Sequence, residues 1–316
     1  MDILMKALYL LIFPGLLYCS VAGLLLAGID RKVVARMQKR IGPPLLQPTY
    51  DFFKLLGKET IVPAAAARRT FLAAPVVGLV SLVVTAVLVP VFGFSAFGGV
   101  ADVVVILYLL TIPAVSIIMG GAASGSPFAG VGISREMVAM MAYELPLVII
   151  LLAVGKVAGG DGVTFSLSNI VAYQQANGPL ITDWTMWPAA LAMLLVIPAE
   201  IGSHPFDVAE AETEICEGPL VEYSGAPLAL FKLSSAIKLY IMTALFSCLF
   251  LSGWGTGMVA VDALILLAVC ACIMLICVTL VRAVCARLKV EILFRFYWRV
   301  VAALAACSLI LAWLVG

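Results

Sequence analysis

Long runs of apolar residues without a charged side chain alternate with shorter polar segments along most of the chain. Four runs are uninterrupted, at residues 7–29, 71–94, 103–123 and 263–281. Each is close to the ~20 residues that a helix needs to cross a bilayer. Because the runs are continuously apolar and do not alternate with polar positions, they predict membrane-spanning helices and not the strands of a barrel.

Four further segments are apolar but short or interrupted, at residues 137–155, 184–199, 227–251 and about 292–316. Together the eight segments predict an all-α polytopic membrane protein with about eight transmembrane helices in a single integral membrane domain. The first run is too long for a cleaved signal peptide and is expected to be the first span. The composition agrees with this class, since 64% of the residues are hydrophobic and only 12% are charged.

The positive charges are placed unevenly between the segments. The polar stretch 30–70 holds nine of them, namely Arg31, Lys32, Arg36, Lys39, Arg40, Lys54, Lys58, Arg68 and Arg69. The positive-inside rule then predicts cytoplasmic loops near residues 30–70, 121–136, 200–226 and 282–291, with both termini on the outer side. The loop at 200–226 carries no positive charge and is placed by alternation alone.

Two of these loops have recognisable local patterns. Within 30–70, residues 50–59 predict a short amphipathic helix that lies on the membrane surface or against another subunit. The basic residues of the same loop have two possible roles. They either set the orientation of the chain in the membrane and bind lipid headgroups, or they dock a partner. The glycine- and serine-rich stretch 121–136 fits either a close backbone approach or hinge, or a flexible connector.

Acidic side chains occur where a bilayer makes them costly. Glu144 falls inside the fourth apolar run, and an acid at the centre of a span costs about 2.5–3.5 kcal/mol on insertion scales. Such a residue is expected to face the bundle interior or water. It serves as a protonatable site or, alternatively, makes a structural hydrogen bond or an ion pair with Lys232 or Lys238.

Seven acids crowd between residues 200 and 222 in a stretch of chain that lacks any Lys or Arg: Glu200, Asp207, Glu210, Glu212, Glu214, Glu217 and Glu222. A helix beginning at Pro205 would place Asp207, Glu210 and Glu214 on one face. Like charges held together in low dielectric cannot all ionise, which suits a proton relay. The alternatives are acids favoured by the helix dipole, a solvated loop, or a docking surface for a partner's cations.

Cysteine and histidine offer little metal chemistry. The eight cysteines show no CxxC spacing, and most fall inside apolar runs. The only histidine, His204, is expected to make a local hydrogen bond. We therefore expect neither a metal site nor a catalytic group in this chain.

Three segments carry a resemblance to a known family: "DRKVVARMQKRIGPPLLQPTYDFFKLLGKE", "SREMVAMMAYELP" and "PFDVAEAETEICEGPLVEYSG". They resemble the eight-helix membrane subunit that is shared by respiratory complex I, where it forms the quinone chamber, and by group 4 membrane-bound nickel–iron hydrogenases. The short passage from Arg40 to Gln47 and the order Glu217-Gly218-Pro219 are similar to the hydrogenase branch. Gly202-Ser203 stands where quinone-type members carry Asn-Arg.

The resemblance implies a prokaryotic inner-membrane subunit without a redox cofactor, which anchors a peripheral arm and couples proton reduction to H2 with proton or sodium translocation. Implied partners are the hydrogenase large and small subunits, a ferredoxin-like iron–sulfur subunit, antiporter-like membrane subunits and lipid, but no nucleic acid. The nickel–iron centre and iron–sulfur clusters would lie in those partners. The implied proton-path residues are Glu144, Glu200, Asp207, Glu210, Glu212 and Glu214. The implied arm-interface residues are Arg31, Arg36, Arg40, Glu217, Glu222 and Tyr223.

Two alternatives remain open at this stage. The same subunit could serve a complex I-like oxidoreductase of quinone or methanophenazine, which predicts a lipid-accessible chamber beneath the first loop. An autonomous ion transporter is a third possibility, although we detect no inverted repeat.

Overall fold

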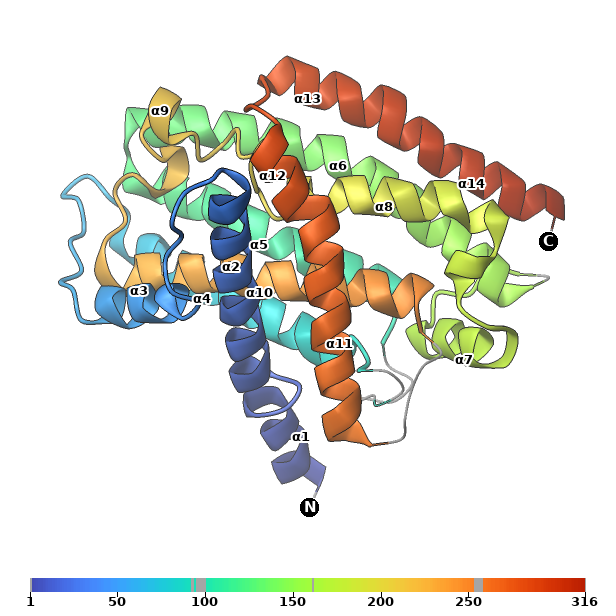
Figure 1. Ribbon diagram of the computed structural model, residues 1–316. Helices are drawn as coiled ribbons and strands as arrows, with labels where there is room; N and C mark the ends of the chain where they lie inside the picture. The colour runs from blue at the N-terminus through green and yellow to red at the C-terminus, as the bar shows by residue number, and fades with distance from the viewer. Residues whose placement is uncertain (1, 92–93, 95–100, 161, 253–257, 316) are drawn as a thin grey trace.

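The computed structural model describes residues 2–91, 94, 101–160, 162–252 and 258–315. The fourteen α-helices of this part of the chain are drawn in Figure 1. They are α1 (Asp2–Leu11), α2 (Leu16–Met37), α3 (Gln47–Leu56), α4 (Arg68–Leu88), α5 (Val103–Ser124), α6 (Pro127–Gly159), α7 (Leu167–Asn177), α8 (Trp187–Glu200), α9 (Glu212–Ile215), α10 (Gly225–Phe250), α11 (Val259–Met274), α12 (Leu280–Val284), α13 (Val290–Phe296) and α14 (Ala302–Val315).

Seven of the helical segments are long and apolar enough to cross a membrane, and the shorter apolar helix Trp184–Glu200 is an eighth candidate. Two of the seven contain a π-helical turn, which joins α11 to α12 at Leu275–Thr279 and α13 to α14 at Tyr297–Val301. The predicted all-α polytopic class is therefore confirmed. The first apolar run differs in detail, because it divides near Pro14 into α1 and α2.

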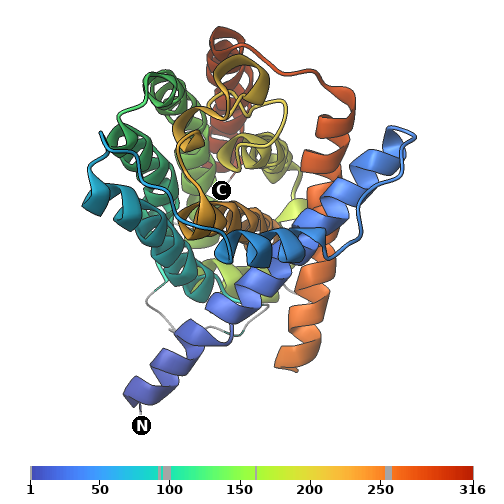
Figure 2. The same ribbon diagram turned by 90° about the vertical axis from the view of Figure 1, so that its left-hand side faces the viewer.

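Helix α10 forms the centre of the bundle. Every residue from Ala236 to Phe250 is buried, and Figure 2 shows α10 surrounded by the other helices. It packs against α2, α3, α4, α8 and α11. The surrounding spans keep more of their apolar side chains exposed, as expected where those side chains contact lipid or neighbouring subunits.

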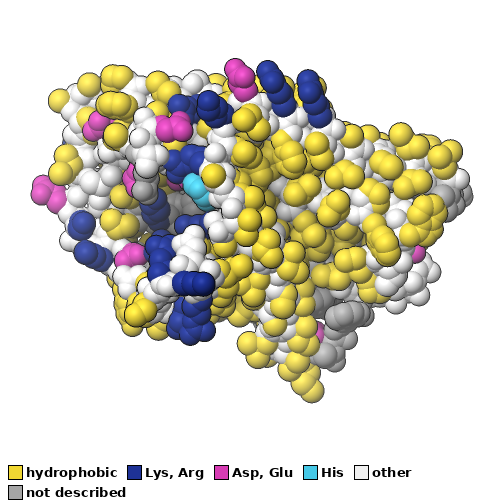
Figure 3. Space-filling view, turned by 45° about the horizontal axis from the view of Figure 1, so that its top comes forward, with side chains coloured by type: hydrophobic (Ala, Val, Ile, Leu, Met, Phe, Trp, Pro, Cys, Tyr) yellow, Lys and Arg dark blue, Asp and Glu magenta, His cyan; other side chains and the backbone are white. Residues whose placement is uncertain are grey.

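Polar and apolar side chains are segregated on the surface. Figure 3 shows one face on which hydrophobic side chains cover a broad area, while Lys and Arg side chains gather around a hollow beside it. The hollow lies near the end of the bundle where α2, α3 and the loop before α9 come together (Figures 1 and 3). The basic loop 30–70 therefore borders a cavity.

The first loop folds back tightly on the helix that precedes it. Gly42 packs against α2, where a Cβ atom would lie 2.9 Å from the Cβ atom of Ala35, and Gly28 of α2 approaches the carbonyl of Leu45 closely. The predicted short helix at 50–59 is confirmed as α3, shifted to Gln47–Leu56. It packs on α2 and α10 of its own chain, with Tyr50 and Phe53 left exposed.

The stretch 121–136 is mostly helical, so the flexible-connector alternative is wrong. Helix α5 continues to Ser124, turns at Gly125 with φ +71°, and α6 starts at Pro127. The glycines allow close packing: a Cβ atom on Gly121 would lie 3.1 Å from the Cβ atom of Pro219, and one on Gly132 would lie 2.9 Å from the nitrogen of Pro219. The close-approach interpretation is the one that the structure supports.

Candidate functional site

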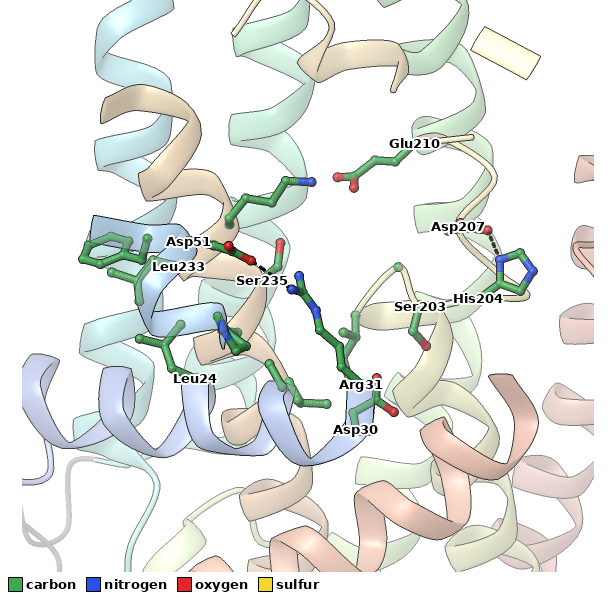
Figure 4. Close-up of a pocket in the computed structure, with 18 of the residues that line it drawn as sticks. Leu24, Asp30, Arg31, Asp51, Ser203, His204, Asp207, Glu210, Leu233 and Ser235 are labelled. Atoms are coloured by element: carbon green, nitrogen blue, oxygen red, sulfur yellow. Dashed lines mark hydrogen bonds and ion pairs between the residues drawn. The ribbon is translucent and has the colours of Figure 1, made fainter. Parts of the chain in front are cut away.

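A cavity of about 670 Å³ lies beneath α3. Its walls come from α2, α3, α10, α12 and the loop between α8 and α9. Figure 4 shows Arg31 extending from α2 toward Asp51, with Asp207 and His204 on the opposite side and Glu210 projecting from the loop. Segments that are far apart in the sequence thus meet around one space.

The lining of this cavity is strongly charged. Six basic residues and four acidic residues face it alongside His204; they are Arg31, Lys54, Lys58, Lys232, Arg282, Arg287, Asp30, Asp51, Asp207 and Glu210. Apolar residues such as Leu24, Phe52 and Leu239 complete the walls. Charged groups are costly to remove from water unless they are paired. We therefore interpret the cavity as a hydrated space whose walls are held together by ion pairs.

Two ion pairs connect α2 to its surroundings. Asp30 is buried, and its carboxylate accepts hydrogen bonds from Arg282 Nη1 at 2.7 Å and from Thr279 Oγ1 at 2.8 Å. The π-helical turn at Leu275–Thr279 carries Thr279 to this position. Arg31 donates to Asp51 Oδ2 at 3.1 Å, and this second pair is about half exposed.

Asp207 makes the most complete ion pair of the cavity. Arg287 Nε donates to its Oδ1 at 2.9 Å and Arg287 Nη2 donates to its Oδ2 at 2.8 Å. His204 Nδ1 lies 3.1 Å from the same Oδ1, which confirms the local hydrogen bond expected for this histidine. The acidic stretch has no Lys or Arg near it in the sequence. The segment before α13 supplies the missing cation, Arg287.

The helix predicted to begin at Pro205 is absent, and that prediction was wrong. The chain turns at Gly202, where φ is +68°, and helix α9 starts only at Glu212. Phe206 and Val208 are buried in the bundle, and Leu288 N donates to the carbonyl of Pro205 at 3.1 Å. Tertiary contacts replace the intrahelical hydrogen bonds, so the predicted single acidic face does not form.

A second, smaller space of about 50 Å³ lies deeper in the bundle. Lys238 Nζ contacts Glu200 Oε1 at 2.9 Å there, and both side chains are nearly fully buried. Glu200 Oε2 and Ser234 Oγ are buried without a hydrogen-bond partner in the described structure. A space of this size and polarity is large enough for water, which needs roughly 10–15 Å³ of such volume per molecule.

The two spaces share part of their lining. Asp207, Glu210 and Ser235 border both, and Glu136 of α6 borders the inner one. Glu144, which is half-buried in α6, borders neither space. No ion pair or hydrogen bond of the Glu144 side chain occurs in the described part of the chain, and Lys238 pairs with Glu200 instead. The tertiary structure thus places acids from different segments of the chain around both the outer cavity and the inner space.

Glu214 lies apart from these two spaces, where it accepts from Arg135 Nη1 at 2.6 Å on the surface side of α6. Glu212 opens α9, but its side chain lies outside the described residues. Asp207, Glu210 and Glu200 are the predicted acids that line the two connected spaces.

The predicted arm-interface residues fall into two groups. Arg31, Arg36, Arg40 and Glu222 are exposed, as interface residues should be, and Arg31 also lines the cavity. Tyr223 is buried and stacks on Phe71 with ring centroids 4.0 Å apart. Its hydroxyl donates to the carbonyl of Phe71 at 3.0 Å, and burial raises the pKa of this phenol. The Tyr223 side chain is an internal anchor and not part of the exposed surface.

Glu217, the last of these candidates, is half-buried and adopts a left-handed conformation with φ +68° just before Gly218. It therefore belongs to the turn that leads into α10.

Sequence reasoning missed three features of the site: Asp30, Glu136 and the role of Lys238 as the partner of Glu200. Asp30 and Glu136 each lie next to an arginine in the sequence, which makes them look like ordinary interface charges. The sequence suggested Lys238 only as a partner of Glu144. Among the residues that the structure describes, no cluster of three or more His, Cys, Asp or Glu side chains is placed to hold a metal ion.

Comparisons with known proteins agree on one family. The family model described as NADH dehydrogenase matches residues 8–313. The chain is 38% identical to Hydrogenase-4 component C of Escherichia coli (strain K12), over 72% of this chain and 70% of that protein. It is 33% identical to an NADH-quinone oxidoreductase subunit of Neorickettsia sennetsu, over 94% of this chain and 93% of that protein.

A solved structure shares the fold. It is a chain of the membrane-bound sulfane sulfur reductase, an archaeal respiratory membrane complex, with a TM-score of 0.88 and 29% sequence identity. The match covers 98% of this chain and 99% of that chain.

Proposed function

Because the chain belongs to the NADH dehydrogenase family, we propose that it serves an energy-converting, ferredoxin-linked nickel–iron hydrogenase. At the level of the family, it is a core membrane subunit of a complex I-like or group 4 hydrogenase-like complex. Within that class, the 38% identity to Hydrogenase-4 component C supports the hydrogenase branch. Membership in a family of complex subunits also argues against an autonomous transporter.

The proposed partners are a peripheral arm and other membrane subunits. The arm comprises the hydrogenase large and small subunits and a ferredoxin-like iron–sulfur subunit. Its nickel–iron centre and iron–sulfur clusters supply the chemistry that reduces protons to H2. Antiporter-like membrane subunits carry the translocated proton or sodium ion. The present chain links the two, in a prokaryotic inner membrane with both termini on the outer side.

The observation that carries this proposal is the charged lining of the cavity and its continuation to Glu200. A quinone is neutral, so the ten charged side chains of this lining give it no electrostatic attraction. A proton path requires protonatable groups and water at close spacing. Asp207 and Glu210 border the outer cavity and the inner pocket alike, which gives such a path a continuous lining.

Each residue has a definite part in the proposed coupling. Asp207 is held by both of its oxygens and fixes the loop, while Glu210 lies between the two spaces. Glu200 keeps one oxygen on Lys238 and leaves the other open to the inner pocket. A change of charge in the docked arm shifts protons among Glu210, Glu136 and Glu200, and Glu144 passes the change toward the membrane partners.

The test is Glu200→Gln in the whole complex, assayed in inverted membrane vesicles. H2 evolution from reduced ferredoxin and the resulting ion gradient are measured together. We expect the gradient formed per H2 to fall about 100-fold, at the low end of what a positioned proton-transfer group contributes. Glu291→Gln is the matched control, because Glu291 is an exposed acid that borders neither space and is not among the predicted arm-interface residues. Normal coupling in Glu200→Gln would contradict the proposed path.

A second candidate is the equivalent subunit of a quinone- or methanophenazine-reducing complex. The observation that favours it is the chamber beneath the first loop, with an apolar part formed by Leu24, Phe52 and Leu239. In that case quinone-site inhibitors would block turnover, and the complex would reduce a quinone without forming H2. The same vesicles distinguish the two reactions.

A further inference from the structure

A separate basic hollow lies on the surface beside the cavity. It measures about 290 Å³ and is bordered by Arg31, Arg40 and Arg282, together with Val34, Ala35, Ile41, Gly42 and Pro43. None of these eight lining residues is acidic. A helix dipole accounts for a cation at the end of α2 or of α12, but it does not account for three guanidinium groups around one hollow.

The three arginines retain donors for a ligand. Arg31 and Arg282 each use only Nη1 in their contacts with Asp51 and Asp30. No ion pair or side-chain hydrogen bond of Arg40 occurs in the described part of the chain. Guanidinium groups match phosphate oxygens with paired N–H donors. The hollow therefore has the chemistry of a phosphate site.

The hollow is also held in shape. The chain after α2 returns along that helix, with Arg40 N donating to the carbonyl of Ala35 at 2.9 Å. Gly42 permits this return, because a Cβ atom there would lie 2.9 Å from the Cβ atom of Ala35. The ion pair between the buried Asp30 and the partly exposed Arg282 fixes the opposite wall. A preformed site loses less entropy on binding than one that must be ordered.

Exposed apolar side chains lie on the border of the hollow and on the neighbouring span. Ile41 borders the hollow and is fully exposed. Ile276, Leu280 and Val284 follow at intervals of four residues and share one exposed face of the neighbouring span. Arg282 lies two residues from Leu280 and from Val284, and therefore on the opposite face of α12. An isoleucine in the position of Ile41 is stabilised by contact with hydrocarbon.

We propose that the hollow binds the phosphate of an anionic phospholipid whose acyl chains contact Ile41. Phosphate at Arg31, Arg40 and Arg282 matches the charge, and the fully exposed Ile41 at the border distinguishes a lipid from an acidic segment of a partner protein. Arg31 and Arg282 border the inner cavity as well. A bound lipid phosphate, with one negative charge, therefore contacts two of the six basic residues that face the cavity.

The experiment compares bound lipids on the full chain after reconstitution into nanodiscs of phosphatidylcholine and phosphatidylglycerol. Native mass spectrometry counts the lipids that remain after release. The wild type should retain one phosphatidylglycerol in preference to phosphatidylcholine. Arg40→Gln should weaken that retention about fivefold, since one basic residue near a membrane surface contributes about that factor. Arg40→Lys should preserve part of it.

The matched control is Arg36→Gln, which removes the same charge from the same segment outside the hollow. Unchanged retention in this variant supports a discrete site. Equal losses in Arg36→Gln and Arg40→Gln would assign the effect to diffuse surface charge and overturn the proposal. So would equal retention of the two lipids by the wild type, or tight binding of inorganic phosphate to lipid-free protein. Release of the peripheral arm by Arg40→Gln with an unchanged lipid count would assign the hollow to a protein partner and would also overturn it.

Discussion

Two ion pairs that adjoin the loop before α9 differ in how completely they are satisfied. Asp207 and Arg287 line the outer cavity, and both carboxylate oxygens of Asp207 accept hydrogen bonds from Arg287. Glu200 and Lys238 lie deeper, with only 3% and 8% of their side chains exposed, and Glu200 Oε2 has no partner in the described structure. The first pair is complete and partly hydrated, whereas the second is buried and incomplete.

The difference separates two uses of charge within one molecule. In a complete pair, each charge-assisted hydrogen bond contributes to stability, and the pair holds its loop in place. A buried acceptor without a partner costs about 1–3 kcal/mol, and that cost persists unless water or a proton occupies the site. Glu200 is thus the group that keeps a hydrogen-bonding position open for water, while Asp207 supports the geometry around it.

Removing the cation of the inner pair should produce the largest effect. Lys238→Met leaves Glu200 buried without a counter-charge, and breaking such a pair typically costs about 3–5 kcal/mol. Thermal unfolding of the detergent-solubilised chain measures this loss, and Glu200→Gln in the same chain should recover much of it. Lys232→Met is the control, because Lys232 is exposed on the same helix. Equal stability of the two methionine variants would show that the inner pair is not buried as described.

Breaking the outer pair should have an intermediate effect. Asp207→Asn removes the negative charge and one of the two acceptors of Arg287, so one charge-assisted hydrogen bond is lost and the other becomes an ordinary one. Each charge-assisted bond contributes about 1.5–3 kcal/mol, and the partial exposure of the pair reduces the loss. Hydrogen exchange should become faster across residues 201–211, because the loop loses its anchor. Exchange in Glu222→Gln should match the wild type. If Asp207→Asn leaves the loop equally protected, its buried residues Phe206 and Val208 hold it without the ion pair.

The smallest effect is expected at the rim of the cavity. Arg31 and Asp51 form a pair with side chains 46% and 42% exposed, and exposed pairs contribute about 0–1 kcal/mol. Arg31→Gln in lipid-free detergent should lower stability by less than either preceding change. The difference from the wild type should shrink further in 1 M salt, where the screening length falls to about 3 Å. A large, salt-independent loss would instead give Arg31 a buried structural role.

Much of the fold could be predicted from the chain alone. Eight apolar segments correspond to the seven spanning candidates and the shorter helix Trp184–Glu200, because backbone groups in lipid must bond within their own helix. The short helix of the first loop was also predicted, since Phe52, Phe53 and Leu56 give it an apolar periodicity. The helix at Pro205 failed because burial of Phe206 and Val208 outweighed the local preference.

The amino-acid sequence by itself determined the number and type of spans, the family, and the presence of acids in places where a bilayer disfavours them. The tertiary structure alone decided which charges meet. Asp207 finds Arg287 across 80 positions of the chain, and Asp30 finds Arg282 across 252. Local sequence patterns do not predict such pairings, because only helix packing brings the partners together. The low dielectric between the helices strengthens the electrostatic interaction of each pair.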